Sequence, residues 1–282
     1  MNINAHTDLY CILGNPVHHS LSPVMHNTAF KKLGINAIYC ALSPTSIKAG
    51  IEAIRTLGIK GASITIPYKT EAIRYIDEID DMAKIIGAIN TISNSEGKIR
   101  GYNTDGYGAI QSLRNGGVQV RDRNYLVIGN GGSARAISFS LLEEGASVLI
   151  AGRNDRNVAG LADELKSRYD SVSGTLLSKL NAQAMERIDV IINSTPLGMH
   201  PDVGTMPIDI DLVRKNHIVF DIVYTPHTTR FLNEAKKRGC RVIYGIDMLV
   251  NQGARQFEIW TGASAPIDVI TRELRKLTVR LR

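Results

Sequence analysis

The chain has 282 residues, of which 44 % are hydrophobic and 21 % charged, and its formal net charge is +6. This composition is ordinary for a globular protein and gives room for one large or two modest domains. The polar start "MNINAHTDLY" does not resemble a signal peptide, and no apolar run reaches the ~18 residues of a membrane-spanning helix, so we expect a cytoplasmic protein with no membrane partner.

The first hundred residues alternate strand-like and helix-like segments. Strands are predicted at 9–14, 37–43 and 61–67, and helices at 23–34 and 45–58. Ser22 is the expected N-cap of the first helix, with Pro23 as its first residue and Gly34 as its stop. The βαβαβ order predicts a mainly parallel sheet with helices on its faces. Two short β runs around "SEG" in 89–105 predict a hairpin.

A second series of strands and helices begins near Arg123, and we place a domain boundary near Asp105. Strands are predicted at 124–130, 147–152, 189–195, 217–223 and 241–245, and helices at 132–145, 158–169 and 229–239. Two helical patterns, 247–262 and 266–281, follow without an intervening strand. The regular alternation predicts a second α/β domain with a parallel sheet.

The stretch "YLVIGNGGSARA" contains the pattern Gly129-x-Gly131-x-x-Ala134 between a predicted strand and a predicted helix. In the G-x-G-x-x-G/A fingerprint, the first glycine makes a tight turn and the second lets a pyrophosphate approach the backbone. The helix N-terminus then offers free N–H groups to the anion. Because the strand, the helix and the next strand are all present, this turn predicts a dinucleotide site rather than an ordinary glycine-rich turn.

The end of the next strand bears on the choice of dinucleotide. An NAD site usually has Asp or Glu there, whereas this chain has Gly152 and Arg153. A guanidinium matches a 2′-phosphate in charge and geometry, so we expect NADP. Asp155 could instead reach the ribose of NAD, with Arg156 offsetting its charge, and Arg153 could simply begin a solvated helix.

Polar residues of the first domain follow strands or begin helices, where ligands bind in open α/β folds. Each also has an ordinary structural interpretation as a cap, turn or surface residue. Hydride transfer to a carbonyl needs a group that gives or takes the proton on oxygen, and a lysine held by a carboxylate serves this purpose. Hydroxyl groups near a helix N-terminus suit a substrate carboxylate. These polar candidates are Ser20, Ser22, Thr65, Lys69, Asn90 and Asp105.

Seven motifs, distributed from Leu9 to Gly262, occur in one order together with the glycine-rich turn. They are "GNPVHHSLSPVMHN", "ITIPYK", "GAINT", "GYNTDG", "NSTPLGM", "DIVYTP" and "MLVNQGARQFEIWTG". In this set the chain resembles the shikimate dehydrogenase family, which belongs with the quinate/shikimate dehydrogenases. The resemblance implies an oxidoreductase that reversibly reduces 3-dehydroshikimate to shikimate with NADPH, in chorismate and aromatic amino acid biosynthesis. It also implies a substrate domain of residues 1–104 plus 246–282 and a Rossmann-like domain of residues 105–245, with a cleft between them.

The resemblance also implies a role for each candidate residue. Lys69 would be the catalytic acid/base and Asp105 its partner at the reacting carbinol. The substrate would be bound by Ser20, Ser22, Thr65, Asn90, Asp105, Tyr224 and Gln252. The cofactor would be bound by Gly129, Asn130, Gly131, Gly132, Ser133, Arg153, Asn154, Thr195, Ile222 and Gly245, and Asp81 matches a glutamate near the cofactor in some members.

One departure from the family pattern keeps a second activity open. The family's "NRT" is "GRN" here, and Asn157 stands where the family has a basic residue after the arginine, with Arg156 one place early. Asp155 resembles the acidic residue that accompanies NAD use in the quinate/shikimate branch. An enzyme that uses NAD and also accepts quinate is therefore the first alternative.

The remaining alternatives are of other classes. A non-catalytic dinucleotide sensor would lack the Lys69–Asp105 pair, and a Ser-His nucleophile in "NPVHHSLSPVMHN" would leave the glycine-rich turn unexplained. We expect His26 to be a packed helix residue. Basic residues do not gather with aromatic ones, and the chain has no metal-ligand spacing. We therefore expect a small-molecule substrate, no nucleic acid, no metal, and a monomer or homodimer.

Overall fold

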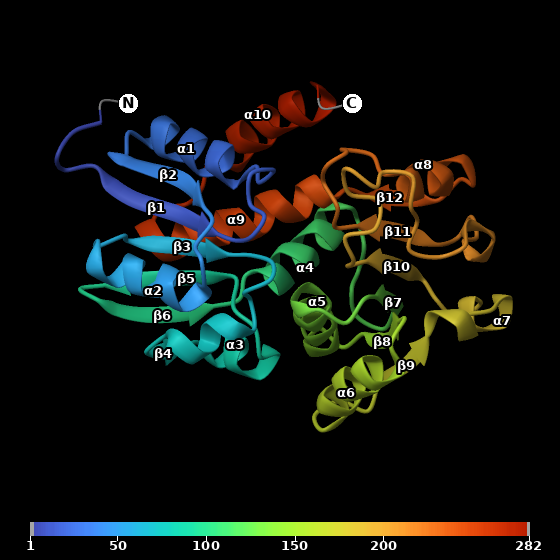
Figure 1. The fold of residues 1–282 in the computed structure, drawn as a ribbon. Helices are drawn as coiled ribbons and strands as arrows, with labels where there is room; N and C mark the ends of the chain where they lie inside the picture. Colours follow the sequence, from blue (N-terminus) through green and yellow to red (C-terminus); the bar gives the residue numbers. More distant parts are fainter. Residues whose placement is uncertain (1–2, 281–282) are drawn as a thin grey trace. The chain divides into compact units, whose positions relative to one another are not determined.

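The computed structural model describes residues 3–280, with side chains described up to Thr278. The chain divides into two compact units, Met1–Tyr107 with Val250–Leu274 and Gly108–Leu249 with Arg275–Arg282. Both units are α/β, as the alternation of segments predicts (Figure 1). Among the helices of residues 3–280, none has the length and apolar character needed to cross a bilayer.

The first unit is built on a six-stranded sheet with the order β2-β1-β3-β5-β6-β4. Strands β1, β2 and β3 are parallel, and β5 and β6 form the predicted antiparallel hairpin. The short strand β4 and helix α3 were not predicted from the sequence. The elements are β1 (Asp8–Leu13), α1 (Ser22–Leu33), β2 (Ala37–Leu42), α2 (Ile47–Thr56), β3 (Gly61–Ile64), the 3₁₀ helix η1 (Glu71–Tyr75), β4 (Glu78–Ile79), α3 (Asp81–Ile86), β5 (Thr91–Ser95) and β6 (Lys98–Tyr102).

Alternating side chains of β1 serve the two faces of this sheet. Cys11 and Leu13 belong to a buried cluster with residues of α2, η1 and α3. On the other face, the ring of Tyr10 lies 5.2 Å from Phe30 of α1 and 5.4 Å from Trp260 of α9 (Gly245–Thr261). The C-terminal part of α9 is thus a component of the first unit, although β7 to β12 lie between it and β6 in the sequence.

The start of α1 differs from the prediction. Ser22 is the first helical residue, Leu21 is the N-cap, and no side chain caps the helix. The prediction of Ser22 as N-cap is wrong because Ser20 supplies the local hydrogen bond instead, its hydroxyl accepting from the Ser22 backbone N–H at 3.2 Å. Both hydroxyls therefore lie at the N-terminus of one helix.

The second unit has a six-stranded, fully parallel sheet with the order β12-β11-β10-β7-β8-β9. This is the doubly wound arrangement of a Rossmann-like domain. Helix α8 covers β11 and β12, while α5 lies on β7 and β8. The remaining elements of the chain are α4 (Asp105–Asn115), β7 (Asn124–Ile128), α5 (Gly132–Glu143), β8 (Ser147–Gly152), α6 (Asp155–Lys166), β9 (Val172–Leu176), η2 (Leu177–Lys179), α7 (Ala182–Met185), β10 (Val190–Asn193), η3 (Ile210–Leu212), β11 (Ile218–Asp221), α8 (Arg230–Lys237), β12 (Arg241–Ile243), α9 and α10 (Ile267–Arg280). The start of α4, the C-terminal part of α9 and the part of α10 up to Leu274 belong to the first unit.

Each sheet has a point at which the strand order reverses. In the first unit the chain runs from β1 to β2 on one side and then crosses to β3 on the other. In the second unit β7 lies between β8 and β10, so the chain leaves it in opposite directions. Ligands of open α/β sheets bind at the carboxyl ends of strands beside such points. The loops that follow β1, β3, β7 and β10 are therefore the places to look for a site.

Candidate active site

Lys69 and Asp105 form a partly buried ion pair in the first unit. The lysine Nζ contacts the Asp105 Oδ2, and the two side chains are only 15 % and 7 % exposed. Lys69 lies between β3 and η1, and Asp105 begins α4, 36 residues later. A cation held this way has a fixed position and little contact with bulk water. An ammonium group held in this way can give or take a proton at a fixed position.

Asn90 holds the aspartate from the other side. Its Nδ2 donates to Asp105 Oδ1 at 2.8 Å and lies 2.9 Å from Thr104 Oγ1 and 3.3 Å from Gln252 Oε1. Its Oδ1 accepts from the Thr104 backbone N–H at 2.8 Å. Asn90 is 2 % exposed, so these bonds fix the amide firmly. Four predicted site residues (Lys69, Asn90, Asp105 and Gln252) therefore form one cluster.

A second layer of polar side chains supports this cluster. Gln256, one helical turn after Gln252, donates to Thr91 Oγ1 at 3.0 Å and to the Asn90 carbonyl at 3.1 Å. Its Oε1 accepts from Ser63 Oγ at 2.8 Å, and Ser63 accepts from the Tyr39 hydroxyl at 2.6 Å. These residues were not predicted from the sequence. The four-residue spacing of the two glutamines on one helix face was the available signal for Gln256.

The other predicted substrate residues follow β1 and β3, on the two sides of the reversal point. Ser20 is partly exposed and Ser22 is buried, both at the start of α1. Thr65 directly follows β3, and its methyl group packs against Gly14 so closely that Gly14 has no room for a Cβ. This packing brings the two loops together in the first unit.

His26 is a packed residue, as predicted. Its ring is buried and stacks on Tyr39 with a centroid distance of 4.5 Å. Burial lowers the pKa of His26 to about 3, so the ring is neutral at physiological pH. A neutral histidine inside the core is a structural component and not a general base that is exposed to substrate.

The glycine-rich turn of the second unit lies between β7 and α5. Gly129 has φ +121, and a Cβ there would lie 2.6 Å from the Ser194 Oγ, so both the backbone conformation and the packing require glycine. Gly132 and Ser133 are the first residues of α5, and no side chain caps this helix. The N-terminus of α5 is thus available to an anion.

Gly131 tests whether this turn fits a dinucleotide. Its backbone is extended, with φ −83 and ψ −171, and a Cβ would meet no atom within 4 Å. Neither the conformation nor the packing of this chain therefore requires glycine at position 131. A ligand that lies directly against the backbone does require it, and the pyrophosphate of a dinucleotide has this property. Gly131 and the uncapped N-terminus of α5 are therefore both suited to the pyrophosphate of a dinucleotide.

The remaining predicted cofactor residues lie in several places. Arg153 follows β8 and is exposed, and the partly exposed Asn130 belongs to the turn after β7. Asn154 caps α6, its side chain accepting from the Asn157 backbone N–H at 3.0 Å. Asp81 begins α3 in the first unit and is exposed.

Thr195 and Ile222 follow β10 and β11, the strands on the far side of β7 from Arg153. Gly245 begins α9, and a Cβ there would lie 2.5 Å from the Ile222 carbonyl oxygen. Tyr224, which was predicted to face the substrate, is partly buried in the loop after β11. The structure therefore brings Ile222 and Gly245 together.

Three comparisons with known proteins, by family model, by sequence and by structure, indicate the same family. Family models match residues 12–92 (shikimate dehydrogenase substrate binding domain), 112–222 (shikimate / quinate 5-dehydrogenase) and 245–275 (shikimate 5′-dehydrogenase C-terminal domain). The shikimate dehydrogenase (NADP(+)) of Methanocaldococcus jannaschii is 41 % identical over 95 % of this chain and 96 % of its own length. The chain belongs to the shikimate dehydrogenase family.

Solved structures of this family share the whole fold. A crystal structure of shikimate dehydrogenase in complex with NADP+ has a TM-score of 0.93 and 38 % identity, and the match covers 98 % of both chains. The enzyme from Listeria monocytogenes, in complex with shikimate and NAD, has a TM-score of 0.89 and 31 % identity, over 97 % of this chain and 98 % of its own. The predicted family and the predicted α/β fold are confirmed.

Asp221, at the end of β11, is a buried acidic residue of this shikimate dehydrogenase family member that was not predicted from the sequence. It is fully buried, and burial raises its pKa to about 6. The hydrogen bonds from Thr229, Val223 and Asn193 lower the pKa but do not cancel the effect of burial. A folded-state pKa above the usual value of 3.8 means that the folded protein binds this proton more tightly than the unfolded chain. The stabilisation from this proton is present below about pH 4 and is lost as pH rises through about 6.

We therefore expect Asp221→Asn to change the pH dependence of stability. Between pH 4 and pH 7 the free energy of unfolding of the wild type should fall relative to that of the variant by about 3 kcal/mol. Urea unfolding of both proteins at each pH measures this difference. Asp170→Asn, at an exposed position, is the control and should follow the wild type. A constant difference between wild type and Asp221→Asn would contradict the expected titration.

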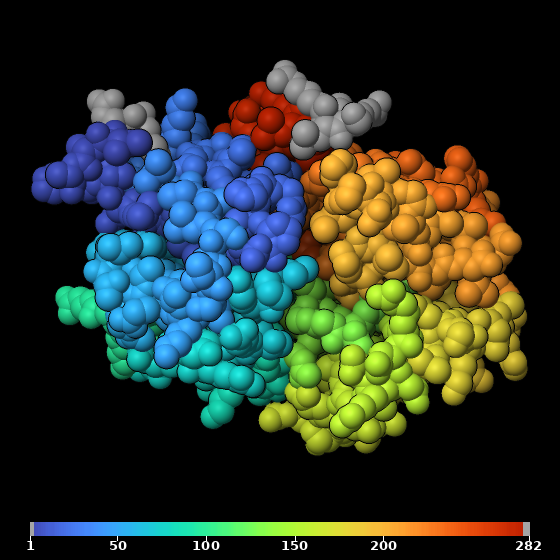
Figure 2. Space-filling view, viewed as in Figure 1, coloured from blue at the N-terminus to red at the C-terminus, as the bar shows by residue number. Residues whose placement is uncertain are grey.

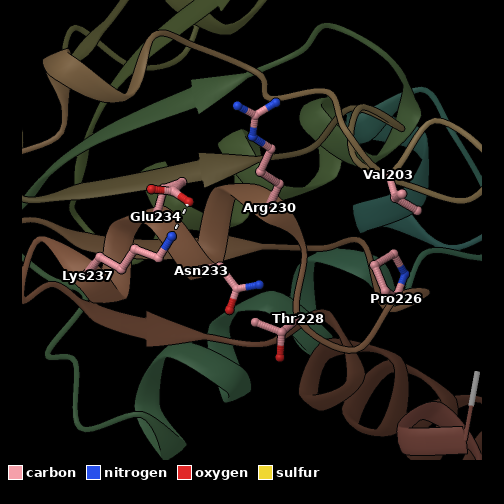
Figure 3. A pocket seen from close by; sticks show the side chains of 7 residues that line it. All are labelled: Val203, Pro226, Thr228, Arg230, Asn233, Glu234 and Lys237. Atoms are coloured by element: carbon pink, nitrogen blue, oxygen red, sulfur yellow. Dashed lines mark hydrogen bonds and ion pairs between the residues drawn. The ribbon is translucent and has the colours of Figure 1, made fainter. Parts of the chain in front are cut away.

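A separate open pocket of about 510 Å³ lies beside α8 (Figure 3). Two of its charges compensate each other, because Lys237 Nζ lies 2.8 Å from Glu234 Oε1. The exposed segment near residue 200, which includes the pocket residue Val203, is light orange in Figure 2 and forms part of the surface in that view. The pocket contains no predicted site residue; it is lined by Val203, Pro226, Thr228, Arg230, Asn233, Glu234 and Lys237.

Proposed function

We propose that this protein catalyses the reversible, NADPH-dependent reduction of 3-dehydroshikimate to shikimate, in the biosynthesis of chorismate and aromatic amino acids. The observation that carries the proposal is the buried Lys69–Asp105 pair, fixed by Asn90 inside a unit that matches the substrate-binding domain of the family. Many relatives at about 40 % identity, including that of Moorella thermoacetica, carry this activity and NADP(+) in their names.

In the reduction, Lys69 donates a proton to the carbonyl oxygen as the C=O π bond breaks, and in the oxidation it takes the proton of the hydroxyl group. Bound NADPH supplies the hydride to the carbon. Asp105 keeps the ammonium group directed at the oxygen, and Asn90 keeps Asp105 in place. Closure around the substrate excludes water from the polar cluster.

The hydroxyl groups of Ser20 and Ser22 bind the substrate carboxylate in this proposal. Both lie at the N-terminus of α1, where the backbone dipole favours an anion. The ring hydroxyls of the substrate contact Thr65, Asn90, Asp105, Gln252 and Tyr224.

The cofactor lies across the reversal point of the second sheet in this proposal. The backbone of Gly131 and the start of α5 hold its pyrophosphate, and Arg153 binds the 2′-phosphate. Further contacts come from Asp81, Gly129, Asn130, Gly132, Ser133, Asn154, Thr195, Ile222 and Gly245. Residues 1–104 with 246–282 act as the substrate domain and residues 105–245 as the cofactor domain, in a cytoplasmic monomer or homodimer.

The test is the absorbance of the reduced nicotinamide with purified protein, shikimate and NADP, with NAD and quinate in parallel. Rapid reduction of NADP with shikimate alone is the expected result. Comparable kcat/KM values with NAD or quinate would favour a quinate/shikimate dehydrogenase. The crystallised Listeria relative, which holds shikimate and NAD, is the observation that keeps this second activity in view. No reduction with any pair would refute the proposal.

Arg153→Ala should raise the KM for NADP by about 10- to 100-fold, because a hydrogen-bonded ion pair with the 2′-phosphate is lost. The KM for NAD, which has no 2′-phosphate, should change less than twofold. Steady-state kinetics with both cofactors measure the two values, and Arg156→Ala, at another exposed position nearby, is the matched control. Equal changes for NADP and NAD would remove Arg153 as the cofactor selector.

A further inference from the structure

Asp221 and Asn193 are the last residues of two neighbouring parallel strands, β11 and β10, and they lie opposite each other in the register. Both side chains are fully buried. Neither is among the residues to which the proposed function gives a contact with substrate or cofactor. Burying a carboxylate away from water costs free energy, so its presence at the ligand-binding edge of the sheet requires an explanation.

The Asp221 carboxylate joins three segments of the second unit. Its Oδ1 accepts from Asn193 Nδ2 at 2.9 Å and from the Val223 backbone N–H at 3.0 Å. Its Oδ2 accepts from the Thr229 hydroxyl at 2.7 Å, and Thr229 in turn caps α8 through the Leu232 N–H at 3.3 Å. The turn after β11 is thus tied both to the end of β10 and to the start of α8.

Asn193 folds the turn after β10 in the same way. Its Oδ1 accepts from Thr195 Oγ1 at 2.7 Å and from the Thr195 backbone N–H at 3.1 Å. Its Nδ2 also donates to the Leu197 carbonyl at 3.1 Å. This turn includes Ser194, which leaves no room for a side chain at Gly129. One pair of side chains therefore fixes both turns on this side of β7.

The strand order of the sheet indicates which part of a dinucleotide would lie over the turns after β10 and β11. Arg153 follows β8 on one side of β7, and β10 and β11 lie on the other side. A dinucleotide bound at such a reversal point places one mononucleotide on each half of the sheet. With the 2′-phosphate of the adenosine half at Arg153, the nicotinamide half lies over the turns after β10 and β11.

We propose that Asp221 and Asn193 are positioning residues that set the backbone of the turns 194–197 and 222–224 for the nicotinamide half of NADP. The inference rests on the proposed function for the identity of the cofactor. Asp221 contacts no ligand itself; it acts through the Val223 N–H, through Asn193 and through Thr229. Its loss should therefore weaken binding of the nicotinamide half and leave the adenosine half unaffected.

Asp221→Asn tests whether Asp221 affects binding of the nicotinamide half but not of the adenosine half, with two ligands. The amide can keep the bonds from Asn193 and Val223, but it puts an N–H₂ group in place of the oxygen that accepts from the Thr229 hydroxyl, so that bond is lost. We expect the Kd for NADP to rise about tenfold and the Kd for 2′,5′-ADP, which lacks the nicotinamide half, to stay within twofold. Tryptophan fluorescence or calorimetry gives both values without turnover. The KM for NADP should rise as well, with the KM for shikimate unchanged.

Thr229→Val and Thr229→Ser provide a matched pair if Asp221→Asn does not fold. Valine removes the hydroxyl that donates to Asp221, whereas serine keeps it. The valine variant should show a loss of similar size that is again selective for NADP, and the serine variant should bind as the wild type does. Equal weakening of NADP and 2′,5′-ADP, or no weakening of either, would overturn the proposal. Because binding is the readout, an inactive wild type would refute the proposed function without deciding this inference.

Discussion

Lys69→Ala is expected to lower kcat by about 10²- to 10⁴-fold and to leave the Kd for NADP within twofold. Lys69 is the cation of the buried polar cluster, and in the proposed reaction it gives or takes the proton on the substrate oxygen. The cofactor-binding turn after β7 belongs to the other compact unit, so its own contacts are not changed by this substitution. Stopped-flow or steady-state absorbance measures kcat, and fluorescence titration measures the Kd.

The controls for this prediction separate chemistry from folding. Removing the lysine leaves Asp105 as a buried carboxylate without its cation, which is destabilising. The double variant Lys69→Met, Asp105→Asn removes both charges, so it should recover much of the stability and none of the activity. Lys84→Ala, at an exposed position of α3, should match the wild type. Unchanged turnover in Lys69→Ala would exclude this residue as the proton donor.

Most of the fold could be predicted from the sequence because its signals are local. Apolar runs, glycine stops and the alternation of segments indicate the strands and helices, and "SEG" indicates the hairpin. The turn around Gly129 is recognisable because a strand and a helix flank it within one short segment. The start of α1 was placed one residue too late because Ser20 and Ser22 are both suitable capping residues, and the choice between them depends on the path of the preceding loop.

The site was predicted only as separate residues. Polar side chains at strand ends could be picked out one by one, but the Lys69–Asp105 pair joins positions 36 residues apart, and Asn90 meets Gln252 across 162 residues. Such pairs depend on strand order, which local patterns do not contain. Asn193 and Asp221 were missed for the same reason. Each ends an apolar strand, and only the parallel pairing of β10 and β11 shows that the two side chains meet.

The glycines of the turn after β7 differ in a way that only the structure reveals, and this difference gives the second large prediction. At Gly129 a side chain would be strained by φ +121 and would clash with Ser194, so Gly129→Val should impair folding. At Gly131 the extended backbone accepts valine and no protein atom lies within 4 Å of a Cβ. Gly131→Val should therefore fold, with a loss of stability of no more than about 1 kcal/mol from the poorer N-cap.

Gly131→Val should nevertheless raise the Kd for NADP by at least about 100-fold. A branched side chain there occupies the space through which a pyrophosphate approaches the backbone, and losing two charge-assisted hydrogen bonds costs about 3 kcal/mol or more. Fluorescence titration measures the Kd, and urea unfolding confirms that the protein is folded. Gly204→Val, another position with no atom within 4 Å, is the control and should bind NADP normally. A folded Gly131→Val variant with wild-type affinity would mean that the ligand does not lie against this turn, and that the N-cap position alone accounts for the glycine at 131.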